Sequence, residues 1–157
     1  SFLDKIGEFD TNLENCVDYD YWLRASLEGG IFHFLDDGIF VIYRNRENSI
    51  SKGGVSYANN GLYVLKKLEK KINKADNRLI KIIKKCKGDW IFKRGRSKLS
   101  ATQKKGAYTD MISSLYFSRK NLIYKILVIC GSIFIKPNKI DFTLKKINPF
   151  KKKTHYD

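Results

Sequence analysis

The helical spacing of apolar residues after residue 53 constrains the fold more than any other feature of the sequence. Through two long stretches an apolar residue returns every three or four positions, which is the pattern of a helix with one buried face. The two apolar stripes are Leu62, Leu65, Leu68 and Ile72, and then Leu79, Ile83, Cys86 and Trp90. The segment "KGDWIFKRGRSK" interrupts this period, so we predict that the helical pattern breaks there.

Two more helices are predicted toward the C-terminus. Ser100 and Gln103 have the spacing of a capping box, which opens the third helix. This helix is predicted to carry Tyr108, Met111, Ile112 and Leu115. The sequence "SRKN" then predicts a turn into a fourth helix that ends before Pro137. The residues predicted to face inward from it are Ile123, Ile126, Leu127, Cys130 and Phe134. We expect these two helices to form an antiparallel hairpin.

The first 53 residues have a mixed pattern. Asn15 is a candidate cap for a helix that starts near Cys16, and Gly29 with Gly30 supplies its stop. The runs "IFHFL" and "IFVIYR", separated by "DDG", predict strand, turn and strand. We therefore expect an α/β fold in residues 1–53, a helical extension in residues 54–146 and a loosely ordered basic tail in residues 147–157.

The charge of the chain favours anionic partners. Lys+Arg number 31 against 16 Asp+Glu, which gives a net charge of +15. This excess attracts phosphates, nucleic acid or an acidic membrane surface, and does not choose among them. Cys16, Cys86 and Cys130 are far apart and form no CxxC pair, so we expect a reducing compartment and neither a disulfide framework nor a zinc site.

The ends and the apolar runs bear on location. There is no initiator methionine and no charged-then-apolar leader, so we expect a fragment without a secretory signal. The most apolar run, "NLIYKILVICGSIFIKP", contains Lys125 and is shorter than the ~20 residues of a spanning helix, which predicts a buried or interfacial helix. The expected location is the cytoplasm, with peripheral attachment at the inner membrane face as a further hypothesis.

Two carboxylates lie close together at the start of the first predicted helix. Asp18 and Asp20 are separated by two positions, which turns their side chains by roughly 200° on a helix, so they must have different roles. Asp20 lies four residues before Arg24 and is predicted to form an ion pair with it. Asp18 instead precedes Tyr21 and Trp22 at three and four positions. Spacing alone leaves two interpretations of Asp18 open, a favourable charge at a helix end or a catalytic acid.

The stretch from residue 6 to residue 51, "IGEFDTNLENCVDYDYWLRASLEGGIFHFLDDGIFVIYRNRENSIS", resembles the second half of the catalytic domain of inverting, GT-A-fold glycosyltransferases of family 2. That family has "G-x-FDE-x-L", then "EDYDLWLRL…G", then "ID" before a strand, then "YR-x-H-x-x-S-x-S". The counterparts here are Gly7, Phe9, Asp10, Leu13, Asp18, Tyr19, Asp20, Trp22, Leu23, Arg24, Gly30, Asp36, Tyr43, Arg44, Ser49 and Ser51. The resemblance depends on their order and spacing together, and it covers about the first third of the chain.

The resemblance implies that this chain holds the C-terminal portion of a Rossmann-like GT-A domain, followed by the helical extension. It implies that Asp18 is the general base that takes a proton from an acceptor hydroxyl as the oxygen attacks the anomeric carbon of a nucleotide sugar. The partners would be a nucleotide-sugar donor and a glycan or lipid-linked acceptor, in the synthesis of cell-surface polysaccharide or lipopolysaccharide. The family's donor site, with an Asp-x-Asp motif for Mg²⁺ or Mn²⁺, precedes the matching segment. Metal ligands are therefore expected mostly outside this chain, which would be inactive alone.

The sequence departs from the family pattern at three positions. Val17 replaces the usual Glu beside the base, Thr11 replaces a Glu after the "FD" pair, and Arg46 stands where the family often has His. Arginine can still bind a diphosphate through two parallel hydrogen bonds. The "DYD" letters at residues 18–20 start a helix, so we assign no metal to them.

Several other residues are candidates for the site. The substrate-binding candidates are Tyr21, Trp22, Tyr43, Arg44 and Arg46, and the structural support is Asp20 with Arg24. Trp22 also fits core packing, which is the commoner role of such a residue. His33 is predicted to be a packed or edge residue of a strand rather than a catalytic one.

A noncatalytic alternative remains open at this stage. The +15 charge and "KRGRSK" also fit a basic helical module that binds a membrane surface or nucleic acid. The aromatics fall on apolar stripes rather than among basic residues, and no nucleic-acid-binding motif is present, so nucleic acid is not the expected partner. As a further hypothesis, the basic tail anchors the chain at an anionic membrane surface.

Overall fold

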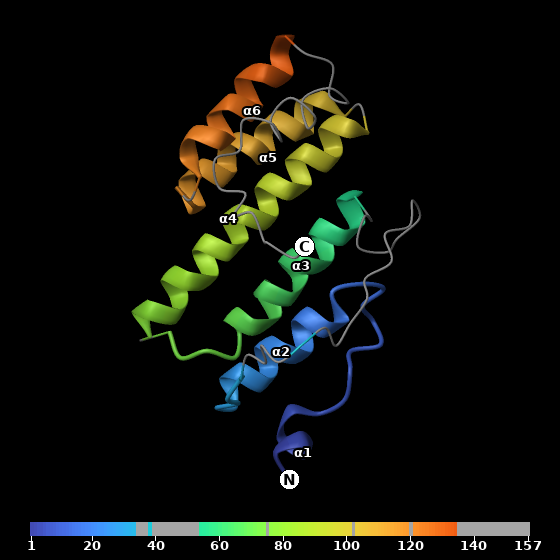
Figure 1. Cartoon of the computed structure of the whole chain (residues 1–157), viewed down its shortest axis with the longest axis vertical. Helices are drawn as coiled ribbons and strands as arrows, with labels where there is room; N and C mark the ends of the chain where they lie inside the picture. The colour runs from blue at the N-terminus through green and yellow to red at the C-terminus, as the bar shows by residue number, and fades with distance from the viewer. Residues whose placement is uncertain (34–37, 39–53, 75, 102, 120, 135–157) are drawn as a thin grey trace. The chain divides into compact units, whose positions relative to one another are not determined.

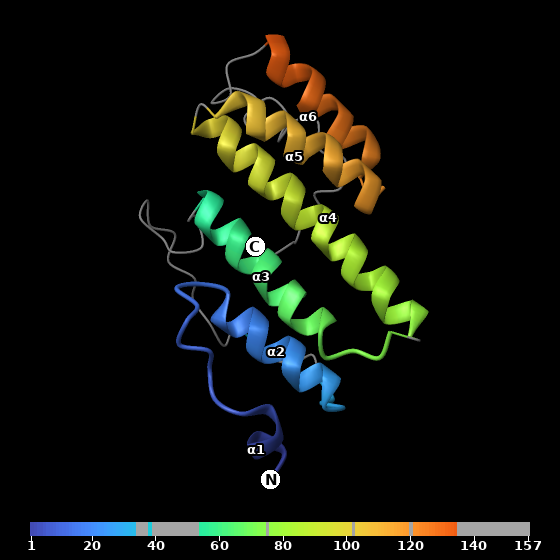
Figure 2. The same ribbon diagram turned by 180° about the vertical axis from the view of Figure 1, so that it is seen from behind.

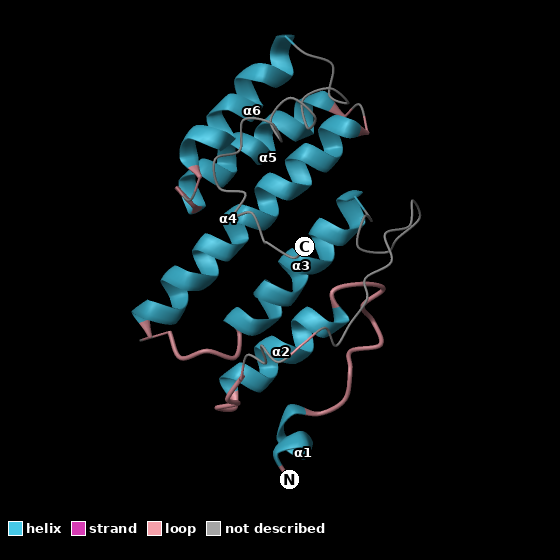
Figure 3. Ribbon diagram, viewed as in Figure 1, coloured by secondary structure: helices cyan, strands magenta, loops and turns pink. Residues whose placement is uncertain are grey.

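The computed structural model describes residues 1–33, 38, 54–74, 76–101, 103–119 and 121–134. The chain divides between Ile83 and Lys84 into two compact units, and the described residues of each are treated separately below. The helices are α1 (Phe2–Ile6), α2 (Val17–Leu27), α3 (Gly54–Glu69), α4 (Asn77–Ser100), α5 (Lys104–Phe117) and α6 (Leu122–Phe134). Figure 3 shows that every regular element in the described residues is a helix.

The expected α/β fold is therefore wrong for the described part of the chain, which is all-helical and contains no strand. Ile31, Phe32 and His33, which begin the first predicted strand, have no regular structure. The Phe32 ring packs edge-on against the Trp22 ring, with centroids 5.8 Å apart. Short aromatic and β-branched runs do not distinguish a strand from a segment that packs through its side chains. The second predicted strand, residues 39–44, lies outside the described residues.

The first unit is built on α2 and α3, which lie side by side in both views (Figures 1 and 2). Leu68, Ile72 and Ile83 are buried together, which confirms that these members of the two predicted stripes face inward. α2 ends at Leu27 and Gly29 follows with a φ of 82°, so the predicted glycine stop is confirmed. Asn15 does not cap α2, whose first turn follows Cys16 without a side-chain cap.

In the second unit, α4 runs without a break through the segment where its pattern was predicted to end. The buried positions there are Gly88, Phe92, Gly95 and Leu99, which keep helical spacing. Because two of these four positions are glycines, only Phe92 and Leu99 mark the buried stripe in the sequence as large apolar residues. A Cβ on Gly95 would lie 2.8 Å from the Ala107 carbonyl oxygen and 3.0 Å from the Met111 nitrogen. The glycines therefore let α4 and α5 approach closely.

α5 and α6 form the predicted antiparallel hairpin (Figure 1). The Tyr108 hydroxyl donates to the Ser132 carbonyl at 3.1 Å, and Met111 packs in one cluster with Val128. The predicted inward face of α6 is wrong. Its buried residues are Lys125, Val128 and Ser132, and the five residues assigned to that face are exposed. The capping box is also wrong, because α4 includes Ser100 and the side chain of Gln103 makes no cap bond.

An ion cluster links α4 and α5. Asp110 on α5 accepts from Arg94 Nη2 at 2.7 Å and from Lys98 Nζ at 2.8 Å, both on α4. Burial alone would raise the pKa of Asp110, but the hydrogen bonds from Arg94 and Lys98 outweigh it and hold the pKa below its ordinary 3.8.

This lowered pKa predicts an acid-sensitive contribution to stability. A carboxylate whose pKa is depressed by folding stabilises the protein above its ordinary pKa, and the contribution is lost as the pH falls through the folded value. We expect the free energy of unfolding, measured with urea, to fall below about pH 4 in the wild type. Asp110→Asn should be less stable at pH 6 and should lose less stability between pH 4 and pH 2. Equal slopes for the two proteins would contradict this assignment.

Candidate functional site

A buried ion network holds the first residues of the chain against α2. Arg24 Nε donates to Asp20 Oδ2 at 2.8 Å, which confirms the predicted i, i+4 pair. Lys67 of α3 lies 2.9 Å from Asp20 Oδ1 and 2.7 Å from Asp10 Oδ2. Asp20 and Arg24 are both buried. The network therefore ties the segment before α2, α2 itself and α3 to one another.

Arg24 also binds the main chain of the preceding segment. Its Nη2 donates to the Glu8 carbonyl at 2.8 Å, and its Nη1 donates to the Ile6 carbonyl. Gly7 lies between these two carbonyls with a φ of 73°, a backbone conformation that favours glycine. Four of the residues that carry the family resemblance, Gly7, Asp10, Asp20 and Arg24, thus have a structural role.

The charges in this network stabilise one another. The hydrogen bond from Lys67 is the largest factor that lowers the pKa of Asp10. Burial tends to lower the pKa of Lys67, but its bonds to Asp10 and Asp20 prevail and raise it. The lysine therefore stays charged and bridges the two acids. Asp10 and Asp20 are both held by cations, so neither is our candidate for a proton acceptor.

Asp18 differs from Asp20 in its exposure and in its partners. It lies in the first turn of α2 and is exposed, and its Oδ1 accepts the backbone N–H of Tyr19 at 2.8 Å. No ion pair joins it to a basic side chain among residues that the structure describes. Asp18 lies at the N-terminal end of α2, where the helix dipole is positive. Asp18 is therefore the carboxylate at this helix start that can meet an external hydroxyl.

A run of aromatic rings lies beside Asp18. The rings of Phe9 and Tyr21 are 4.6 Å apart, Tyr21 is 5.6 Å from Trp22, and Trp22 is 5.8 Å from Phe32. Trp22 is 55% exposed, so the core role considered for it is wrong. Tyr21 follows Asp18 by one turn of α2, which places the two on the same side of the helix.

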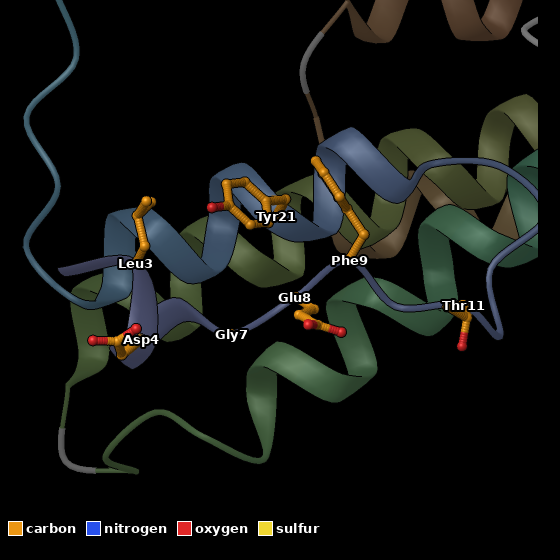
Figure 4. Close-up of a pocket in the computed structure, with 7 residues that line it drawn as sticks. All are labelled: Leu3, Asp4, Gly7, Glu8, Phe9, Thr11 and Tyr21. Carbon is orange, nitrogen blue, oxygen red and sulfur yellow. The ribbon is translucent and has the colours of Figure 1, made fainter. Parts of the chain in front are cut away.

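A groove of about 530 Å³ opens next to these rings. Figure 4 shows Tyr21 and Phe9 beside it, with the carboxylates of Asp4 and Glu8 also at its wall. Leu3, Gly7 and Thr11 complete its described lining. Asp18 is not among these lining residues. The groove thus combines an apolar aromatic wall with hydrogen-bond acceptors, and Asp18 precedes one lining residue, Tyr21, by about one turn of α2.

The other predicted site residues are not brought to this place by the described structure. Tyr43, Arg44 and Arg46 lie outside the described residues, so their assignment as substrate-binding residues stays a prediction. His33 is exposed. Among described residues, no group of three or more His, Cys, Asp or Glu side chains could hold a metal ion.

Sequence reasoning missed Lys67, Phe9 and Phe32. Lys67 lies 57 residues from Asp10 in the sequence, and its position on a lysine-rich helix gives no signal that distinguishes it from its solvated neighbours. Phe9 was quoted only as part of a motif. No signal in the sequence marked the whole aromatic run, because Phe9 lies 12 residues before Tyr21 and Phe32 lies 10 residues after Trp22. Only the fold brings these rings together.

No family model matches the chain, and no match was found among curated proteins or solved structures. The described helices also include none with the length and apolar character needed to cross a membrane. The interpretation of the site therefore depends on its own residues and on the motif resemblance.

Proposed function

We propose that this chain is the acceptor-side part of an inverting glycosyltransferase of the family 2 type, with Asp18 as its general base. The observation that carries the proposal is the separation of the two acids on α2. Asp20 is buried between Arg24 and Lys67, whereas Asp18 is exposed, one turn before the aromatic run. The proposal concerns the chemistry of this helix and not the α/β fold, which the described residues contradict.

The chemistry assigned to each residue follows from its surroundings. Asp18 would accept the proton of an acceptor hydroxyl as that oxygen attacks the anomeric carbon, and the nucleotide diphosphate would leave from the opposite face. The exposed Trp22 and the half-buried Tyr21 offer aromatic surfaces on which the C–H face of an acceptor sugar can stack. The Asp20–Arg24–Lys67 network holds α2 against the segment that contains Phe9. Arg44 and Arg46 are the candidates for the diphosphate.

The proposal places the donor site, and its metal, in a segment before Ser1, as in the family. The coding sequence upstream of Ser1 should therefore encode about 150 to 200 residues of alternating strands and helices, with an Asp-x-Asp after a strand. An upstream region that encodes no such domain would contradict the proposal. The product is expected at the cytoplasmic face of a membrane, where lipid-linked acceptors are presented.

The decisive experiment is a substitution of Asp18 in the longer protein that includes this chain. Asp18→Asn should lower kcat for sugar transfer by at least about 100-fold, because the attacking hydroxyl loses its proton acceptor. Binding of the nucleotide sugar, measured by calorimetry, should be unchanged. Glu14→Gln, which removes another exposed acid near the start of α2, is the matched control and should keep normal turnover. An Asp18→Asn protein with wild-type kcat would remove the base from the proposal.

A further inference from the structure

The outward face of α6 is apolar along its whole length. Seven of the 13 residues of this helix are exposed, and none of the seven is charged or carries a polar amide or hydroxyl group. They are Leu122, Ile123, Ile126, Leu127, Cys130, Ile133 and Phe134. At 3.6 residues per turn these positions fall within an arc of about 140° on one side of the helix. Ile123 is 76% exposed and Phe134 is 87% exposed.

Polar bonds on the inward side fix the rotation of α6. Lys125, which is only 3% exposed, donates to Asp89 Oδ1 at 3.2 Å and to the Ser118 carbonyl at 3.1 Å. Ser132 is buried as well, and its hydroxyl lies 3.3 Å from the Tyr108 hydroxyl. Turning the apolar residues inward would carry Lys125 and Ser132 away from the contacts that they make with Asp89, Ser118 and Tyr108. The apolar face is therefore a fixed outer surface of the hairpin.

The same unit carries the entire net charge of the chain. Residues 84–157 contain 19 of the 31 basic residues and four of the 16 acids, whereas residues 1–83 contain twelve of each. The difference in the second unit equals the net charge of +15 of the whole chain. The 23 residues after α6 alone hold seven lysines. Exposed cations in the described part of this unit include Lys84, Lys85, Lys104, Lys105 and Arg119.

We propose that the outward face of α6 is a membrane-docking surface that inserts into the interface of an anionic lipid bilayer. α6 is about 20 Å long at 1.5 Å per residue, too short to span the hydrocarbon core, so it lies in the plane of the interface. Its apolar side chains enter the level of the acyl chains, and the cations of the unit bind the lipid headgroups. Apolar burial and headgroup attraction together give binding that neither gives alone.

The net charge and the apolar face of the second unit together favour an anionic bilayer over a second copy of the chain or a nucleic acid. A second copy of the chain would bring a further +15 against the first, and repulsion would oppose the burial of the two faces. A nucleic acid would satisfy the cations and leave the apolar face in water. An anionic bilayer satisfies both, and this inference does not depend on the proposed sugar transfer.

Sedimentation of the full chain with sucrose-loaded vesicles tests the docking surface. At about 0.1 M salt, where charges are screened beyond roughly 10 Å, the wild type should sediment with vesicles of phosphatidylcholine containing phosphatidylserine. It should remain mostly in solution with phosphatidylcholine alone. The double variant Ile123→Ser/Phe134→Ser should bind the anionic vesicles about tenfold more weakly, because it loses insertion and keeps every cation. Leu3→Ser/Ile31→Ser is the matched control, since it removes two exposed apolar side chains from the first unit, and should bind as the wild type does.

Chemical modification of Cys130 is a second test of the docking surface, and it needs no substitution. It is exposed on the apolar face, and a charged, membrane-impermeant maleimide should modify it readily in solution. Vesicle binding should slow its modification at least tenfold, as followed by mass spectrometry of the peptide that contains it. A wild type that ignores anionic vesicles, a double variant that binds as tightly, or a Cys130 that stays reactive on bound protein would overturn the proposal. A dimer abolished by Ile123→Ser/Phe134→Ser, without vesicle binding, would assign the face to self-association and overturn it equally.

Discussion

Arg24→Met should lower the free energy of unfolding of the first unit by about 3 kcal/mol. The guanidinium is the single group that binds the Asp20 carboxylate and the carbonyls of Ile6 and Glu8 at once. Methionine fills a similar volume but donates nothing, so a buried carboxylate loses one of its two cations and two carbonyls lose a donor. The cost falls at the lower end of the range for broken buried pairs because Lys67 remains with Asp20.

The destabilisation by Arg24→Met should be confined to the first unit, so hydrogen exchange can locate it. Hydrogen exchange followed by mass spectrometry should show faster exchange in peptides from residues 1–33 and no change in peptides from residues 104–119. Arg78→Met is the matched control, because Arg78 is exposed at the start of α4, and it should change the stability by less than about 0.5 kcal/mol. Adding Asp20→Asn to Arg24→Met should cost less than the sum of the two single changes, since the carboxylate left behind is then gone. Wild-type exchange in residues 1–33 would show that the network does not hold this segment.

The parts of the fold that could be predicted are those in which one helix carries its own signal. The stripe through Leu65, Leu68 and Ile72 and the ion pair of Asp20 with Arg24 depend on residues three or four positions apart, and the structure contains them all. The turn between α5 and α6 also falls where "SRKN" placed it. Local spacing is enough for these features because the partners lie within the same turn or the next.

The parts that could not be predicted depend on contacts between distant residues. The two buried glycines of α4 look like a helix break in the sequence and become a close-packed surface only when α5 lies against them. α6 has apolar residues on every side, so its buried face is selected by Asp89 and Ser118, which satisfy Lys125. Lys67 gains its partners across 57 residues. Of the candidate site, the sequence predicts that Asp18 and Asp20 have separate roles, and only the fold brings the aromatic rings together.

Gly95→Ala should destabilise the second unit by about 3 kcal/mol, although alanine is the better helix former. The added methyl group would lie 2.6 Å from Met111 Cγ, 2.8 Å from the Ala107 carbonyl oxygen and 3.0 Å from the Met111 nitrogen. Two of these atoms belong to the backbone of α5 and cannot move aside, so α4 and α5 must separate along the cluster that contains Phe92 and Leu99.

Gly106→Ala provides a control of opposite sign, because its methyl group would meet only the flexible Lys98 side chain at 3.6 Å or more. That variant should gain about 0.5–1 kcal/mol from helix propensity. Urea denaturation followed by far-ultraviolet circular dichroism, with hydrogen exchange of residues 104–119 to localise the change, measures both. If Gly95→Ala were as stable as Gly106→Ala, the close approach of α4 and α5 would not limit what residue 95 can be.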